Sequence, residues 1–334
     1  MGREEFEVFN NQQILDSYGS ERILVIGAGG TIGSAIARRL FVSGVRDVYM
    51  LDRDESSLHA LALSLSDVAA SHSERYIVGD IRDKVGIRNY FESLRPTVVL
   101  HAAALKHLVM LERFPREGYM ANIVGTKNLL EASVQYGVKR FINISTDKAA
   151  NPTSVLGKTK RIAEFMVHEF AENFHLSGCS VRFGNVFASR GSVIETFIHQ
   201  IKHELPVSIT HPQVTRFFMS SSEAANLVLL AGSMKKSSTL IQNMGSSVLI
   251  TDIVNNLGKF LGKNPKVVFI GLQPGEKMNE ELVDGDVTES SNENIVELVH
   301  PIKTSLTGTV DSEIPVSDRE ALVFIDQLVA ETYS

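Results

Sequence analysis

The sequence predicts an α/β fold in which helices wind over both faces of a parallel sheet, followed by a smaller C-terminal lobe. Short apolar runs alternate with helical patterns of roughly 10 to 16 residues up to about residue 178, which is typical of a doubly wound parallel sheet. A glycine-rich turn at residues 27–33 joins the first apolar run to the first helical pattern. Beyond residue 178 the alternation loosens and the linking segments hold prolines, which favours a separate lobe.

Composition limits the classes of protein that remain open. The chain has 334 residues, 43% hydrophobic and 22% charged, so a sizeable core is expected. Its formal charge of -6 argues against nucleic acid as the main partner. Cys179 is the one cysteine, which argues against a disulfide framework or a cysteine-rich metal site and fits a reducing, cytoplasmic location. No run reaches the ~18 apolar residues of a spanning helix, so we expect no membrane contact. We also expect no metal.

We expect an N-terminal extension over residues 1–20, a main domain over 21–178 and a substrate-binding lobe over 179–334 that returns some strands to the main sheet. Apolar runs predict strands of the main domain at residues 22–27, 47–52, 75–80, 97–104 and 140–144. Amphipathic patterns predict its helices at residues 31–44, 54–69, 85–94, 122–137 and 154–175. In the lobe we expect strands at 179–186, 206–210, 239–243 and 266–271, and helices at 191–204, 220–232, 251–262 and 317–333.

The glycine-rich turn predicts a dinucleotide site. The residues expected to contact a pyrophosphate are Gly27, Gly30, Thr31, Ile32 and Gly33. Glycine permits the tight turn and the close backbone approach, while the helix N-terminus supplies amide donors and a favourable dipole. Asp52 follows about 20 residues later, at the place of the acid that binds the ribose in such sites. Residues 21–178 are therefore predicted to form a Rossmann-type NAD(P)-binding domain.

Two neighbouring residues leave the choice of cofactor open. Asp52 would bond the ribose hydroxyls and favour NAD, whereas the Arg53 guanidinium suits the 2′-phosphate of NADP. Other residues expected at the cofactor lie at the ends of later strands or on the helices that follow: Asp80, Ile81, Ala102, Ala103, Ala104, Asn122 and Lys160. Asn122 can equally be an ordinary helix N-cap.

The segment after the predicted strand 140–144 carries Thr146, Asp147 and Lys148 in a row. An acid beside an amine suits an elimination, in which one group removes a proton next to a carbonyl and the other protonates the leaving hydroxyl. These roles require an enclosed site that raises the pKa of Asp147 and lowers that of Lys148. Thr146 can bond an oxygen on the carbon being oxidised, or the Thr146–Asp147 pair can simply cap a turn.

Lys160 lies on the next helix, four residues after Leu156 and on the same face. It can bond the nicotinamide ribose and lower the pKa of a nearby acid, or it can be a solvated helix lysine. Its combination with the glycine turn and the Thr-Asp-Lys run favours the functional interpretation. We therefore expect Thr146, Asp147, Lys148 and Lys160 to be catalytic.

Eight segments carry a family resemblance: GAGGTIGS, GDIRD, HAAALKH, NIVGTKNLLEA, STDKAANPTSVLGKTK, VRFGNVFASRGSVI, VTRFFMS and GLQPGEK. In this order they resemble the nucleotide-sugar 4,6-dehydratases of the CapD polysaccharide-biosynthesis family, within the extended short-chain dehydrogenase/reductase superfamily. The resemblance covers roughly residues 10–285. It implies conversion of UDP-N-acetylglucosamine to a 4-keto-6-deoxy sugar nucleotide by a tightly bound NAD(P) that takes hydride from C4 and returns it to C6 after water is lost across C5 and C6.

The resemblance also implies individual roles. Asp147 would be the acid on the C6 hydroxyl, Lys148 the base at C5, and Thr146 would bond the C4 oxygen. Many family members carry tyrosine at the position of Leu156, and a membrane-anchored branch carries methionine. Without the tyrosine the C4 hydroxyl proton needs another acceptor, for which our hypothesis is Asp147, assisted by Lys160.

The substrate-binding residues that the resemblance implies are Lys106, Asn185, Arg190, Ser192, Val193, Phe197, Arg216, Gln273 and Glu276. Asn185 would bond the diphosphate, and the forked donors of Arg190 and Arg216 match its two phosphates, although each arginine can also be a surface ion-pair partner. Gln273 stands where the family usually has arginine. UDP is therefore expected as the nucleotide, while GDP stays open. Glu276 would bond the nucleotide ribose or serve as a turn acid.

Two other functions remain open. A 4-epimerase shares the fold and cofactor, but it usually relies on the tyrosine that Leu156 replaces and does not need an Asp-Lys pair. A non-catalytic NAD(P)-binding sensor would not need to retain Asp147, Lys148 and Lys160 together. The resemblance further implies a homo-oligomer, in which the helices 122–137 and 154–175 pair the subunits of a dimer.

Overall fold

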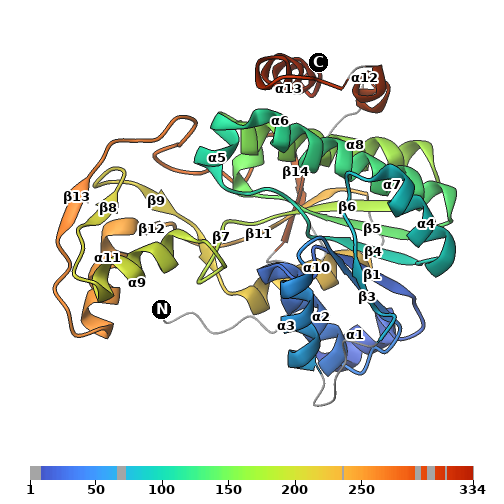
Figure 1. Cartoon of the computed structure of the whole chain (residues 1–334), viewed down its shortest axis with the longest axis horizontal. Coiled ribbons are helices and arrows are strands. Elements are labelled where there is room, and N and C mark those ends of the chain that lie inside the picture. The colour runs from blue at the N-terminus through green and yellow to red at the C-terminus, as the bar shows by residue number, and fades with distance from the viewer. Residues whose placement is uncertain are drawn as a thin grey trace.

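The computed structural model describes residues 9–65, 73–234, 237–289, 295–298, 305–312 and 314–333. Within them, a nine-stranded sheet has the order β14-β15-β11-β6-β5-β4-β1-β2-β3 (Figure 1). Its strands are β1 Ile23–Ile26, β2 Val48–Asp52, β3 Tyr76–Val78, β4 Val98–His101, β5 Arg140–Ile144, β6 Ser177–Arg182, β11 Thr239–Gln242, β14 Val287–Glu289 and β15 Ile295–Leu298. All pairings among β1 to β6 and β11 are parallel, and β15 is antiparallel to β11 and β14. The predicted α/β fold of Rossmann type is confirmed.

The direction of winding reverses between β1 and β4. Ile23 of β1 is opposite Val48 of β2 on one side and Val98 of β4 on the other. Because the connections leave this point in opposite directions, a crevice opens beyond the carboxyl ends of the two strands. The glycine turn that follows β1 lies at this crevice.

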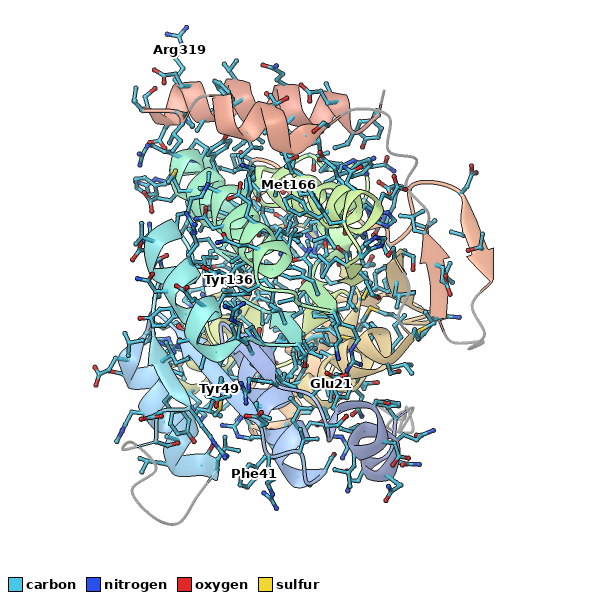
Figure 2. The ribbon with its side chains drawn as sticks, turned by 90° about the vertical axis from the view of Figure 1, so that its right-hand side faces the viewer. Glu21, Phe41, Tyr49, Tyr136, Met166 and Arg319 are labelled. Atoms are coloured by element: carbon cyan, nitrogen blue, oxygen red, sulfur yellow. The ribbon has the colours of Figure 1, made fainter. Side chains whose placement is uncertain are left out.

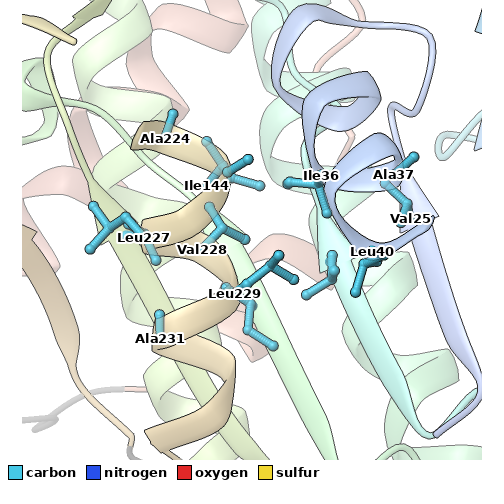
Figure 3. Close-up of a cluster of buried hydrophobic side chains, with 14 of the residues drawn as sticks. Val25, Ile36, Ala37, Leu40, Ile144, Ala224, Leu227, Val228, Leu229 and Ala231 are labelled. Carbon is cyan, nitrogen blue, oxygen red and sulfur yellow. The ribbon is translucent and has the colours of Figure 1, made fainter. Parts of the chain in front are cut away.

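Alternate residues of β1 enter two different cores. Ile23 and Val25 belong to one core and Leu24 and Ile26 to the other. The helices over the first core are α1 (Asn11–Tyr18), α2 (Thr31–Val42), α3 (Glu55–Leu65) and α10 (Ser221–Met234) (Figure 3). The helices over the second are α4 (Lys84–Leu94), α5 (Leu108–Arg113), α6 (Pro115–Gly118), η2 (Tyr119–Val124), α7 (Gly125–Gln135) and α8 (Val155–Asn173). The sheet is thus covered on both faces.

Two C-terminal helices, α12 (Leu306–Ser312) and α13 (Asp318–Glu331), lie over α8. Figure 2 shows Met166 of α8 beneath α13, from which Arg319 points outward. Nearly every α8 residue up to Phe170 is buried. The helix therefore offers no free face for the subunit pairing that the resemblance implies, and the oligomeric state stays a prediction.

The second lobe has a small core of its own. Its elements are β7 (Asn185–Val186), α9 (Val193–Lys202), β8 (Val207–Ile209), β9 (Thr215–Arg216), β10 (Phe218–Met219), β12 (Val248–Leu249), α11 (Ile250–Phe260) and β13 (Val267–Phe269). Side chains of α9 and α11 meet in this core. The boundary predicted at 178/179 falls inside β6, and α10 packs on α2, so much of the second half completes the main sheet. Among the helices of the described residues, none is long and apolar enough to cross a membrane.

A buried charge network ties the second half to α8. Arg182 of β6 pairs with Glu164 of α8 at 2.6 Å and with Asp284 at 2.6 Å. Asp284 also pairs with Arg161 of α8. The segment that holds Asp284 is thereby fixed beside the helix that follows the reactive loop.

Candidate functional site

A cavity of about 630 Å³ lies at the crevice between the sheet and the second lobe. Most of the predicted site residues line it: Gly27, Gly30, Thr31, Ile32, Gly33, Asp52, Arg53, Asp80, Ile81, Ala102, Ala103, Ala104, Lys106, Thr146, Lys148, Lys160, Asn185, Arg190, Ser192 and Val193. Predicted residues that are not part of its lining are Asn122, Asp147, Phe197, Arg216, Gln273 and Glu276. The glycine turn and the reactive loop therefore face one common space.

The glycine turn has no room for side chains. Gly27 has φ +77°, and a Cβ there would come within 2.5 Å of the Ala103 amide nitrogen. A Cβ at Gly33 would lie 2.1 Å from the Gly27 carbonyl oxygen. At Gly30, which precedes α2, no side chain caps the helix. Amides of the helix N-terminus are thus available to an anion, and these residues fit the pyrophosphate of NAD(P).

Replacing Gly33 by alanine is expected to weaken NAD(P) binding at least about tenfold, a loss of ~1.4 kcal/mol. The new methyl group would overlap the Gly27 carbonyl, so the turn must shift away from the position that the pyrophosphate needs. Isothermal titration with each dinucleotide measures the loss. Gly308→Ala in α12 is the matched control, because the nearest atom to its new Cβ is 3.8 Å away. Equal affinity in the Gly33 variant would contradict this role.

Asp52 joins the end of β2 to the glycine turn. Its Oδ2 accepts from the Gly29 amide at 2.9 Å and its Oδ1 from the Asp54 amide at 2.9 Å. Arg53 lines the same cavity. Both residues that bear on the choice between NAD and NADP, Asp52 and Arg53, therefore face the cavity. Asp80 pairs with Arg82 at 2.6 Å, and hydrogen bonds from that guanidinium lower the pKa of Asp80.

A strap from the second lobe, residues 189–192, reaches the glycine turn. The Arg190 amide donates to Thr31 Oγ1 at 3.1 Å, and the Arg190 carbonyl accepts from Lys106 Nζ at 2.8 Å. The Arg190 guanidinium pairs with Asp54 at 3.2 Å and with Ser57 at the start of α3. Arg190 therefore lies at the glycine-turn side of the cavity, and its contact with a substrate diphosphate stays a prediction.

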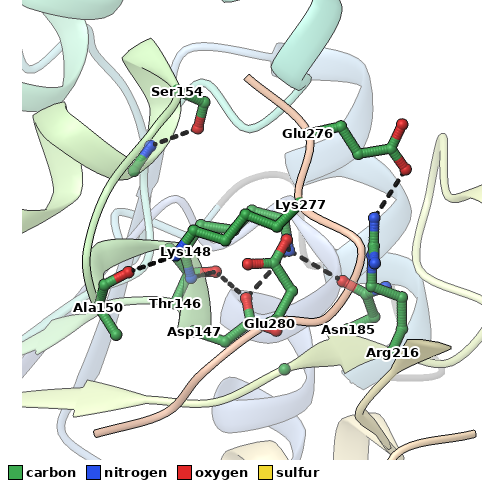
Figure 4. Close-up of polar contacts among 12 residues, drawn as sticks. Thr146, Asp147, Lys148, Ala150, Ser154, Asn185, Arg216, Glu276, Lys277 and Glu280 are labelled. Atoms are coloured by element: carbon green, nitrogen blue, oxygen red, sulfur yellow. Dashed lines mark hydrogen bonds and ion pairs between the residues drawn. The ribbon is translucent and has the colours of Figure 1, made fainter. Parts of the chain in front are cut away.

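The reactive loop follows β5 and begins with the short helix η3 (Asp147–Ala149) (Figure 4). Asp147 is 0% exposed, and its Oδ1 accepts from Thr146 Oγ1 at 2.9 Å and from Lys148 Nζ at 3.0 Å. Lys148 Nζ is also 3.5 Å from Asn185 Oδ1 and 3.5 Å from Glu280 Oε1. Thr146 and Lys148 thus face the cavity, with Asp147 behind them.

The charge state of Lys148 differs from the expected one. Burial alone would lower the pKa of Lys148, but the charges of Asp147 and Glu280 outweigh it and raise that pKa above its ordinary value. The lowered pKa that Lys148 would need to act as a base is therefore not present in this arrangement. Lys148 is an ammonium group held between two carboxylates.

The environment of Lys160 favours its uncharged form, whereas that of Lys148 favours the charged form. It is buried and lines the cavity together with Leu156. Burial, opposed weakly by Glu164, lowers the pKa of Lys160 to about 8. Of these two lysines, Lys160 is the one that can lose its proton near neutral pH.

Replacing Lys160 by methionine is expected to stabilise the protein at pH 7 by up to about 3 kcal/mol. The folded wild-type protein holds this proton less tightly than the unfolded chain, so below pH ~8 it carries the cost of a buried charge. That cost disappears as the pH rises from about 8 towards 10.5, the span of the shift. Urea unfolding at several pH values measures the difference. A gain that does not shrink with pH would contradict the shifted pKa.

Asn122 is neither in the cavity lining nor an N-cap. It lies inside η2, in a helical segment that already begins at Pro115. Its Oδ1 accepts from the Leu105 amide at 2.8 Å, and its Nδ2 donates to the Leu105 carbonyl and to Thr159 Oγ1 at 3.0 Å each. Asn122 therefore fixes the loop after β4. The N-cap interpretation is wrong, and contact of Asn122 with a cofactor stays a prediction.

The predicted diphosphate residues outside the cavity lining have partners within the protein. Arg216 pairs with Glu276 at 2.7 Å, and the backbone N–H of Gln273 donates to Glu276 Oε2 at 3.1 Å. Phe197 is buried in the core of the second lobe. In this arrangement Arg216 is neutralised, so its predicted contact with a diphosphate requires the pair with Glu276 to open.

Sequence reasoning missed Glu280. Burial alternates along the segment that holds it: Glu280 is buried and Glu281 exposed, and Leu282 and Asp284 are again less exposed than Val283. This period of two is typical of an extended segment packed on one face. It is a property of the structure only, because residues 280–284 read Glu-Glu-Leu-Val-Asp and show no apolar alternation, so the sequence carries no signal for Glu280.

Sequence comparison gives the relationships of the chain. A family model described as "Polysaccharide biosynthesis protein" matches residues 23–300. The capsular polysaccharide biosynthesis protein CapD of Staphylococcus aureus is 38% identical over 318 residues, which cover 92% of this chain and 53% of CapD. The chain thus spans about half the length of that relative. The UDP-glucose 4-epimerase of Rickettsia canadensis is 31% identical over 271 residues, covering 79% of this chain and 78% of the epimerase.

Structural comparison agrees with this relationship. The solved structure of MoeE5 in complex with UDP-glucuronic acid and NAD is 26% identical, with a TM-score of 0.66, and covers 78% of this chain and 88% of MoeE5. The family match spans both the sheet and the second lobe. The chain therefore belongs to the polysaccharide biosynthesis protein family, as a CapD-type member of the extended short-chain dehydrogenase/reductase superfamily.

Proposed function

We propose that this chain is an NAD(P)-dependent nucleotide-sugar 4,6-dehydratase that acts on UDP-N-acetylglucosamine or a related sugar nucleotide. One observation supports it most: Thr146 and Lys148, backed by Asp147, line the same cavity as the glycine turn. Leu156, at the position where the resemblance implies tyrosine for many family members, lines the cavity too. The cavity therefore combines a dinucleotide site with a hydroxyl–carboxylate pair that can take up a proton. Lys148, in its charged form, would stabilise the negative charge that develops during the elimination rather than act as the base at C5. Family membership and the CapD relationship favour an enzyme of sugar-nucleotide metabolism.

The glycine turn, Asp52 and Lys160 would hold the cofactor, which supplies reversible hydride acceptance when bound. Asp52 and Arg53 keep both NAD and NADP in the proposal, and the NAD in the MoeE5 structure favours a nicotinamide dinucleotide. Asn185, Lys106 and the strap would contact the sugar nucleotide. UDP is our proposal for the nucleotide, with GDP as the alternative.

The proton of the C4 hydroxyl needs an acceptor, because the apolar side chain of Leu156 cannot take it. Asp147 does not line the cavity, but its Oδ1 accepts from Thr146 Oγ1 at 2.9 Å. We propose that the C4 hydroxyl donates to Thr146 Oγ1 while the Thr146 proton moves to Asp147. Lys160 assists, because its lowered pKa of about 8 lets it lose a proton near neutral pH.

Product analysis tests the function directly. The protein, with NAD and NADP supplied separately, is incubated with a panel of UDP- and GDP-sugars, and the products are identified by NMR. A 4-keto-6-deoxy sugar nucleotide is expected from UDP-N-acetylglucosamine. A galacto epimer or unchanged substrate across the panel would overturn the proposal.

A 4-epimerase is the second candidate, and one observation favours it. The Rickettsia canadensis relative, which is named a UDP-glucose 4-epimerase, shares 31% identity over most of both chains. Leu156 argues against this function, because direct proton exchange at the C4 hydroxyl would fall to the Thr146–Asp147 pair alone. A cytoplasmic location and a homo-oligomeric state are also part of the proposal.

A further inference from the structure

Glu280 is a buried carboxylate to which the proposed reaction gives no role. Its side chain is 2% exposed, and its Oε1 lies 3.5 Å from Lys148 Nζ. Its Oε2 has no hydrogen-bond partner among the described residues. A carboxylate in this state is costly to bury unless a neighbouring positive charge compensates it, and Lys148 is the cation in ion-pair contact.

The segment that carries Glu280 is fixed at both ends. Before it, Lys277 Nζ donates to the Ala150 carbonyl in the reactive loop at 2.8 Å (Figure 4). After it, Asp284 is held by the buried arginines of α8 and β6 and accepts from the Asn151 amide at 3.2 Å. Glu280 is therefore placed beside Lys148 by contacts on either side, independently of its own ion pair.

The charges around Lys148 come from several elements. Asp147 belongs to the same loop, Glu280 comes from the segment after β13, and Arg216 comes from β9. The two carboxylates favour the ammonium form of Lys148, whereas burial and Arg216 oppose it. Burial raises the pKa of Glu280, while the positive charges of Lys148, Arg216 and Lys277 oppose that rise. The ion pair with Lys148 therefore favours the ionised form of Glu280. Because neither carboxylate lines the cavity, Lys148 is the group through which this cluster meets a ligand.

We propose that Glu280 is a positioning residue that acts through Lys148, keeping its ammonium group charged and fixed where it faces the cavity. The kinetic part of this inference rests on the proposed function; the charge state of Lys148 does not. Removing the carboxylate should release Lys148 as a free amine at lower pH and let its side chain leave its present position.

Competitive labelling of lysines with acetic anhydride, followed by peptide mass spectrometry, tests this without any substrate. Only the free amine reacts, so the labelling rate across neutral to alkaline pH reports the charge state. In Glu280→Gln we expect Lys148 to react several-fold faster than in the wild type at the same pH. Lys160 is the internal reference, because it lines the same cavity and its pKa depends on burial and Glu164 instead.

Two further variants separate charge from structure. Glu281→Gln is the matched control, since Glu281 is exposed and bonds Asn151 instead; its Lys148 rate should equal the wild-type rate. Glu280→Asp keeps the charge and should restore slower labelling in part. Circular dichroism identifies a misfolded variant, in which case the aspartate variant decides. A Lys148 rate that is the same in wild type and Glu280→Gln, or equally raised in Glu281→Gln, overturns the proposal.

Turnover provides an independent measurement. If the dehydratase activity exists, Glu280→Gln should lower kcat with little change in KM and move the alkaline limb of the pH profile to lower pH. Unchanged kcat together with an unchanged profile overturns the kinetic role. Absence of dehydratase activity in the wild type would refute the proposed function alone, because the labelling result would still decide the charge state of Lys148.

Discussion

Replacing Asp147 by asparagine is expected to lower dehydration turnover by about a thousandfold, within the range for losing a positioned acid–base group. The amide keeps the shape of the side chain, but it cannot accept the proton that Thr146 passes on, and it removes one of the two charges that hold Lys148. The rate of formation of the 4-keto product, followed by NMR at saturating substrate, measures the effect.

The control for this variant is Asp286→Asn, an exposed aspartate outside the cavity lining, which should keep wild-type turnover. Thermal unfolding checks that the Asp147 variant is folded, since losing one member of a buried pair also costs stability. Full turnover in folded Asp147→Asn would exclude the Thr146–Asp147 path and leave Lys160 as the acceptor.

Replacing Asp284 by alanine is expected to destabilise the protein by about 3 to 5 kcal/mol, the usual cost of breaking a buried ion pair from one side. Asp284 is the shared partner of Arg161 and Arg182, whose side chains are almost fully buried. Glu164 still compensates Arg182, so Arg161 carries most of the uncompensated charge. Urea unfolding measures the change.

A double-mutant cycle shows whether this loss comes from the uncompensated charge. Arg161→Met in the Asp284→Ala background should recover part of the lost stability, because it removes the arginine that the first change left without its partner. Asp286→Ala is the surface control and should lie within about 0.5 kcal/mol of the wild type. A loss below about 1 kcal/mol in Asp284→Ala would mean that the network contributes little.

The parallel sheet was predictable because its signals are local. Each strand from β1 to β5 lies within a predicted range, since an apolar run of about five residues followed by a turn identifies a buried strand without knowledge of its partners. The glycine turn is equally local, as Gly27 and Gly33 need their conformation and closeness whatever the rest of the chain does. The strand-end residues of the cofactor site follow from the same pattern.

The partners of the polar side chains were not predictable in this way. Arg216 and Glu276 pair with each other although they are 60 positions apart in the sequence, and no short-range sequence pattern indicates such a pair. The charge state of Lys148 could not be predicted from the sequence, because its neighbour Asp147 was known but Glu280, which comes from a distant segment, was not. Asn122 was misplaced because the α-helical turn Pro115–Gly118 and the π-helix Tyr119–Val124 begin the helical segment before it. Only Pro115, a residue common at a first helical position, gave a hint.

The strap over the cavity has a consequence for the rates of ligand exchange. It joins the second lobe to Thr31, Asp54 and Lys106. We expect a dinucleotide bound at the glycine turn to leave more slowly where these contacts have to break first. A redox cycle that closes within one turnover has no need for rapid exchange, whereas an enzyme that releases reduced dinucleotide after each cycle would be limited by it.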